Sequence, residues 1–72
     1  MSSAERRVRI TVAARLTGTN GKVLWRADAI SASQPYRVEA DRLTTDVNKR
    51  AAIASATRIL AETIYNRMTS GF

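Results

Sequence analysis

The sequence of 72 residues contains no cysteine, no histidine and only one proline. Without cysteine the chain has no disulfide, no thiolate metal site and no lipidation cysteine. Without histidine it lacks the commonest general base and the commonest protein metal ligand. No Gly-rich phosphate loop is present, and Glu39 and Asp41 are expected to solvate a connection or start a helix. These absences argue against an enzyme, and no cofactor or metal site is predicted.

Long apolar runs are absent as well. No stretch of 18 apolar residues occurs, so no membrane-spanning helix is predicted, and the N-terminal residues lack the apolar core of a signal peptide. The apolar fraction of 44% is normal for a globular chain. A chain this short forms at most one small domain. We expect a disordered basic or polar tail over residues 1–6 and a single β-β-α module over residues 7–72.

Two segments with a strand pattern flank an Asn-Gly dipeptide at residues 20–21. Asn-Gly readily supplies two consecutive residues with positive φ, which predicts a tight hairpin turn between strands at about 7–17 and 22–33. In the second strand, the side with Val23, Trp25, Ala27 and Ala29 is the better candidate for the core; Leu24, Arg26, Asp28 and Ile30 lie on the other. Pro35 cannot donate to a ladder, so the strand ends there or lies at an edge.

The segment from about residue 44 to Met68 has no Gly or Pro and is rich in alanine, which predicts one long amphipathic helix. Thr44, Thr45 and Asp46 are N-cap candidates, and Gly71 is a candidate residue just past the helix end. At 100° per residue an apolar stripe forms from Ile53, Thr57, Leu60, Ala61, Ile64 and Met68. The predicted structural core comprises Val12, Trp25, Ile53, Leu60 and Ile64.

The fold class predicted is therefore α+β, an antiparallel hairpin followed by one helix packed on the sheet. Two strands make a narrow sheet, and the first strand presents an open edge beside apolar residues. We expect completion by further β structure. It comes either from self-association with another copy through a strand edge or from a larger mixed-sheet sandwich.

Basic residues outnumber acidic ones by 12 to 6, giving a net charge of +6, and ten of the twelve are arginine. Arginine binds phosphate or carboxylate bidentately, so an anionic partner fits. Arg9 and Arg15 share one side of the first strand, with Lys22 and Arg26 across the turn. A merely solvated sheet face is the alternative. Nucleic acid is a less favoured partner, because no helix-turn-helix glycine turn, paired sheet aromatics or zinc ligands occur.

The order of elements resembles the C-terminal half of the LptE (RlpB) family of lipopolysaccharide-assembly lipoproteins. The resemblance covers about residues 7–72. It rests on the strand at 8–16, the turn at 17–21, Lys22-Val23-Leu24-Trp25, the Ser31-Ala32-Ser33 segment with Tyr36, and an alanine-rich helix closing on residues 64–68 and 70–72. The family's signal peptide, lipidated cysteine, first strand and first helix have no counterpart in these 72 residues.

This resemblance implies a non-catalytic component of lipopolysaccharide transport and assembly at the periplasmic face of the outer membrane. The chain would supply the last two strands and last helix of a sandwich, dock to the LptD β-barrel, and contact lipopolysaccharide phosphates. Arg42, near the start of the last helix, joins Arg9, Arg15 and Arg26 as a candidate anion-binding residue on this basis. A different periplasmic accessory domain and a small basic nucleic-acid-binding protein are the alternatives.

Overall fold

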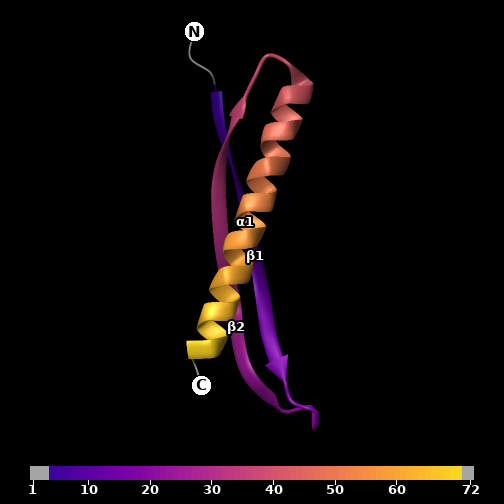
Figure 1. Cartoon of the computed structure of the whole chain (residues 1–72), viewed down its shortest axis with the longest axis vertical. Helices are drawn as coiled ribbons and strands as arrows, with labels where there is room; N and C mark the ends of the chain where they lie inside the picture. The colour runs from indigo at the N-terminus through magenta and orange to yellow at the C-terminus, as the bar shows by residue number, and fades with distance from the viewer. Residues whose placement is uncertain (1–3, 71–72) are drawn as a thin grey trace.

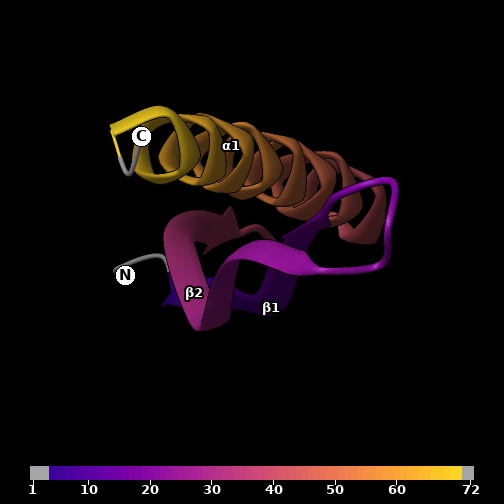
Figure 2. The ribbon, with the colours of Figure 1, turned by 90° about the horizontal axis from the view of Figure 1, so that it is seen from below.

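The computed structural model describes residues 4–70 as a two-stranded hairpin covered on one face by a single helix (Figure 1). Strands β1 (Ala4–Thr17) and β2 (Val23–Val38) pair antiparallel, and α1 (Arg42–Ser70) runs back along them. The molecule is elongated, with extents of 57 × 18 × 15 Å. Seen end-on, the hairpin and the helix form two separate layers (Figure 2). The predicted α+β class, with its hairpin and long helix, is confirmed.

The hairpin turn forms where the Asn-Gly dipeptide predicted it, but with a different backbone. The Gly21 N–H donates to the Gly18 carbonyl at 3.0 Å, and the Gly18 N–H donates to the Lys22 carbonyl at 2.8 Å. Only Gly21 has a positive φ, of 82°, among residues 4–70. The connection is therefore a three-residue loop that ends in one left-handed glycine, rather than a tight turn with two positive φ values.

Both strands extend further than the sequence pattern predicted. Residues 4–6, expected to belong to a disordered tail, pair with residues 36–38, and β2 continues through Pro35, which lies opposite Arg7. Residues 1–3 of that predicted tail lie outside the described residues. Proline is tolerated in an edge strand when its nitrogen faces away from the neighbouring strand. Within residues 4–70 the sheet has two strands, so β2 has such an outer side along its length and Pro35 does not end it.

Two irregularities lie on β2 and change which of its residues face the helix. Val12 pairs with Ile30, but Ala14 pairs with Ala27, so β2 carries one extra residue there, and a second follows beyond Trp25. A bulge reverses the side-chain alternation that follows it. Ile30, assigned by simple alternation to the side opposite Trp25, therefore faces α1 and is only 2% exposed. Because of the two irregularities, the predicted core side of β2 is wrong at three positions: Ile30 is buried, whereas Val23 and Ala29 are exposed.

The helix begins at Arg42, two residues before the predicted start, because Asp41 caps it. The Asp41 carboxylate accepts hydrogen bonds from the Leu43 N–H at 3.3 Å and the Thr44 N–H at 3.2 Å. These are two of the donors that the first helical turn leaves without an intrahelical partner. Of the three predicted caps, Thr45 instead ties the helix to the preceding loop, accepting from the Glu39 N–H at 2.8 Å. Gly71 lies outside the described residues.

The core is a thin layer between α1 and β2. Its members, each at most 8% exposed, are Ile30, Ala32, Ala52, Ala56 and Leu60. Of the predicted core residues, Leu60 lies in this layer, while Val12, Trp25 and Ile64 are partly buried against it. Ile53 is 38% exposed, so its assignment to the core is wrong. The helix is turned so that small alanines meet the sheet and the predicted apolar stripe is only half covered.

The helix covers β2 more than β1 and crosses the hairpin obliquely, lying beyond β2 at both ends of the sheet (Figure 1). The apolar residues of β1 that face the helix layer are consequently only partly buried: Val8, Ile10, Val12, Ala14 and Leu16. Among the described residues, no helix has an apolar stretch of the length and purity needed to cross a bilayer.

Candidate anion-binding face

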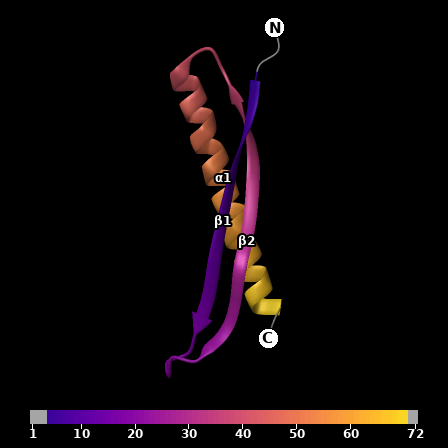
Figure 3. The same cartoon turned by 180° about the vertical axis from the view of Figure 1, so that it is seen from behind.

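The hairpin surface opposite α1, here named the open face, is turned toward the viewer in Figure 3. Five arginines belong to this face. Alternation along β1 places Arg7, Arg9 and Arg15 there, because Val8, Ile10 and Leu16 turn toward the helix. The register then brings Arg26 and Arg37 of β2 to the same face, opposite Arg15 and Glu5. All five side chains belong to exposed residues. The sheet thus presents one hydrophobic and one basic surface.

Arg15 and Arg26 face each other directly across the two strands near the turn. They border a hollow of about 360 Å³, whose other lining residues are Ala13, Ala14, Ala27 and Asp28. Two like charges on one rung repel each other, and an anion between them removes that repulsion. Asp28 supplies part of this compensation: its Oδ1 lies 3.1 Å from the Arg26 Nε. Because this pair is well exposed, solvent weakens it and a phosphate can compete for Arg26.

A second basic group lies toward the other end of the open face. Arg9 pairs with Ser33, and Arg7 donates from a guanidinium nitrogen to the Ser33 Oγ at 3.2 Å. Thr11 and Ser31 join their hydroxyl groups at 2.9 Å on the next rung. From Arg9 to Arg15 the strand advances about 20 Å at its usual rise per residue. The face therefore offers two separate cationic points with hydroxyl groups between them.

Arg42 does not belong to this face. It is the first residue of α1, in the helix layer, at the end of the molecule remote from the hairpin turn (Figure 1). Arg15 and Arg26 lie near that turn. Three of the four arginines proposed from the sequence thus come together on one surface, and the fourth lies apart.

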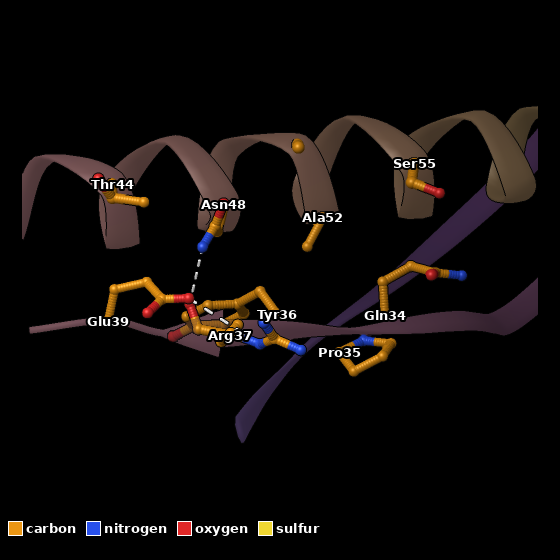
Figure 4. Close-up of a pocket in the computed structure, with 10 residues that line it drawn as sticks. Gln34, Pro35, Tyr36, Arg37, Glu39, Thr44, Asn48, Ala52 and Ser55 are labelled. Atoms are coloured by element: carbon orange, nitrogen blue, oxygen red, sulfur yellow. Dashed lines mark hydrogen bonds and ion pairs between the residues drawn. The ribbon is translucent and has the colours of Figure 1, made fainter. Parts of the chain in front are cut away.

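A separate, wide groove of about 510 Å³ lies between the first half of α1 and the end of β2 (Figure 4). Residues from both sides of β2 line it, among them Pro35 and Tyr36, so it opens at the outer edge of that strand. Asn48 spans it, donating from its amide nitrogen to the Arg37 carbonyl at 3.0 Å. This contact is an anchor between helix and strand.

The acidic residues of this region have structural partners. The Glu39 Oε1 lies 3.9 Å from the Arg37 Nε, and the Glu39 backbone N–H donates to the Thr45 hydroxyl. A hydrogen bond from the Thr44 hydroxyl, followed by the backbone N–H groups of Leu43 and Thr44, lowers the pKa of Asp41 below the ordinary 3.8. Within residues 4–70 no three side chains of the metal-ligating types gather into a site.

Arg7 and Arg37 belong to the open face although the sequence pattern did not single them out. Arg7 lies two residues before Arg9 in β1, so strand alternation alone already places both on the same face. Arg37 needs the extension of β2 through Pro35, and only the pairing in the folded chain shows that.

Comparison with known proteins gives one match. The model of the family described as LptE, lipopolysaccharide-assembly, matches residues 2–68. No curated protein and no solved structure matches the chain.

Proposed function

The chain belongs to the LptE lipopolysaccharide-assembly family, and on that premise we propose that it docks to an LptD-like β-barrel and contacts lipopolysaccharide. Membership implies a role in lipopolysaccharide assembly, within a family that is non-catalytic and associated with the outer membrane. The finer proposal concerns how this chain takes part. It assigns lipopolysaccharide binding to the open face and barrel docking to the outer surface of α1.

The observation that carries the ligand assignment is the convergence of Arg9, Arg15 and Arg26 on one uncovered sheet face. Lipid A and the inner core carry phosphates, which guanidinium groups bind through charge-assisted, bidentate hydrogen bonds. The opposed pair Arg15 and Arg26 is the strongest point of attraction, since bound phosphate relieves its internal repulsion. Arg42 remains a proposed contact to lipopolysaccharide phosphate that is separate from the open face, because it lies at the start of α1.

Lipopolysaccharide binding is tested by titrating the chain with lipopolysaccharide and with the same material after removal of its phosphates. Arg15→Gln and Arg26→Gln should each weaken binding several-fold, and dephosphorylated lipopolysaccharide should bind the unaltered chain poorly. Arg58→Gln is the matched control, because it removes the same charge from the exposed surface of α1. Equal losses in all three variants would mean that only net charge matters. If the chain bound nucleic acid in a salt-dependent way and lipopolysaccharide did not displace that nucleic acid, the assignment of lipopolysaccharide binding to the open face would be refuted.

The docking assignment is supported by large apolar side chains on the surface of α1 turned away from the sheet. Leu43 is 75% exposed, and Val47 and Tyr65 are each 63% exposed. At about 100° per residue these three fall within about 40° of one another, on the side opposite Ala56. Isolated exposed apolar residues are common, but an aligned set marks a surface suited to a protein partner.

Docking is tested by co-purifying the chain with an LptD-like barrel. Val47→Gln and Tyr65→Gln keep good helix formers in α1 while removing the apolar surface, so both should reduce recovery of the barrel. Arg58→Gln lies on the same outer side and serves again as the control. Full recovery with both apolar positions replaced would refute this docking surface.

A further inference from the structure

The outer edges of the two strands differ in how well they resist pairing with another strand. β2 contains a proline, Pro35, and two bulges. One bulge lies between Ile30 and Ala27 and the other between Trp25 and Val23. Prolines and bulges are standard protection of an exposed edge. β1 has neither over its 14 residues, and it advances one residue per rung throughout. Its edge is therefore the one open to a further strand.

The pairing of Pro35 with Arg7 indicates which groups that edge offers. A proline fits an unbroken ladder where its nitrogen points away from the neighbouring strand, and the residue opposite it then also points its backbone groups outward. By alternation, Arg7, Arg9 and Thr11 direct their N–H and C=O groups to the free side of β1. Unpaired groups in such a row form a template for antiparallel addition.

We propose that this edge pairs with β1 of a second copy of the chain, antiparallel, with Ile10 opposite the Ile10 of the partner copy. Charge complementarity selects this register. On the open face it sets Glu5 opposite Arg15 of the partner, Arg9 opposite Thr11, and Arg7 opposite Ala13. The ion pair forms twice because of the two-fold symmetry. Cross-strand pairs of opposite charge stabilise a sheet, and like charges destabilise it.

Neighbouring registers place arginine against arginine. If the two β1 strands were centred on Val8, Arg7 would lie opposite Arg9 of the partner copy. If they were centred on Arg9, the two Arg9 residues would lie opposite each other. Centring on Thr11 or Val12 brings Arg15 opposite Arg7 or Arg9. Registers centred farther along leave about a third or more of β1 unpaired. Shifts that exchange the faces are excluded because they set apolar residues among the arginines.

The apolar surface supports the same arrangement. In this register Val8 lies opposite Val12 of the partner, and the two Ile10 side chains meet on the symmetry axis. These residues are only partly buried in one copy, because α1 lies over β2. The symmetry axis is perpendicular to the sheet, so both helices lie on one face of a four-stranded sheet. Asn48 lies on the side of α1 that faces the outer edge of β2, where it spans the groove. The partly exposed Ile53 lies on the other side of α1 and is therefore turned toward the apolar residues of β1 at the symmetry axis.

Cysteine cross-linking tests the register, and the absence of native cysteine makes each introduced thiol unique. Under mild oxidation Ile10→Cys should form a disulfide-linked dimer in high yield. Val8→Cys and Val12→Cys should each fail alone, since each residue lies about 13 Å from its own copy, yet they should cross-link when mixed. Equal self-linking of all three variants would overturn the register. Sedimentation of the unmodified chain as a monomer at about 100 μM would overturn the association itself.

A pair of proline variants tests the edge, because Arg9 and Ser33 share one rung and both direct their N–H outward. Arg9→Pro should raise the dimer dissociation constant about tenfold or more, because the two-fold symmetry removes one ladder hydrogen bond from each copy, two in all. Ser33→Pro should leave that constant within about threefold, because the β2 edge is not used. The reverse order of effects would place the interface on β2.

A charge exchange keeps the proposal testable if a proline variant does not fold. Glu5→Arg should weaken the dimer by setting two arginines opposite each other, and adding Arg15→Glu should restore it. Failure of the double variant to recover would contradict the Glu5–Arg15 pairing.

Discussion

Shortening Leu60 to alanine tests whether α1 packs as described. Leu60 is 5% exposed and belongs to the buried cluster with Ile30, Ala32 and Ala56. Truncation to alanine therefore removes apolar atoms that are shielded from water. Buried leucine-to-alanine changes cost about 2–5 kcal/mol, depending on how far the surroundings collapse. Because a single helix on a narrow sheet can move inward, we expect about 3 kcal/mol. A domain of this size should then melt about 12–24 °C lower.

The control is Leu43→Ala, the same change in the same helix at a residue that is 75% exposed. Helix propensity changes equally in both variants, so the difference between them isolates burial. Leu43→Ala should change the unfolding free energy by no more than about 0.5 kcal/mol. Thermal melts by circular dichroism at one fixed protein concentration measure both, since self-association would make the melting temperature concentration-dependent. Equal destabilisation by the two variants would refute the packing of α1.

A third variant separates the packing observed from the stripe predicted by helical periodicity. Ile53 belongs to that stripe but is 38% exposed. Ile53→Ala should therefore cost about 1–2 kcal/mol, less than Leu60→Ala. If Ile53→Ala cost more, the helix would be rotated toward the predicted stripe and the alanine contact with β2 would be wrong.

Three further changes probe the close helix–sheet contact, the turn and the cap. Ala56→Leu should destabilise by about 2 kcal/mol in thermal melts, because Ala56 is 0% exposed, whereas Ala54→Leu on the exposed side should be nearly neutral. Gly21→Ala should cost about 1 kcal/mol in urea unfolding, purely from its φ of 82°, because an added Cβ meets nothing within 4 Å. Gly18→Ala has no positive φ, but its added Cβ would lie 3.2 Å from the Asn20 Oδ1, so its cost reports crowding in the turn instead of backbone strain. Folding lowers the pKa of Asp41 below 3.8, so its stabilisation is complete at neutral pH and is lost as the pH falls through the folded pKa. The melting temperature should thus be lower at about pH 3 than at about pH 6, and Asp41→Asn, which retains a cap without titrating, should narrow that difference.

The candidate site was partly predictable because a strand has a strict two-residue alternation. That alternation alone puts Arg9 and Arg15 on one side of β1, and the Asn-Gly dipeptide brings Arg26 to them across the turn. It does not predict an extra residue in a strand, and so it assigned Ile30 to the wrong face. Arg37 was missed for a related reason, since Pro35 ends a central strand but not an edge strand.

The amino-acid sequence by itself determined the elements, the turn position, the single basic surface and the family, because these depend on local pattern and on the order of residues. The tertiary structure alone decided which side of α1 meets the sheet and which strand the helix covers. The physical reason is close packing: Ala52 and Ala56 let the helix approach β2, and no periodicity of hydrophobic residues encodes that preference for small side chains.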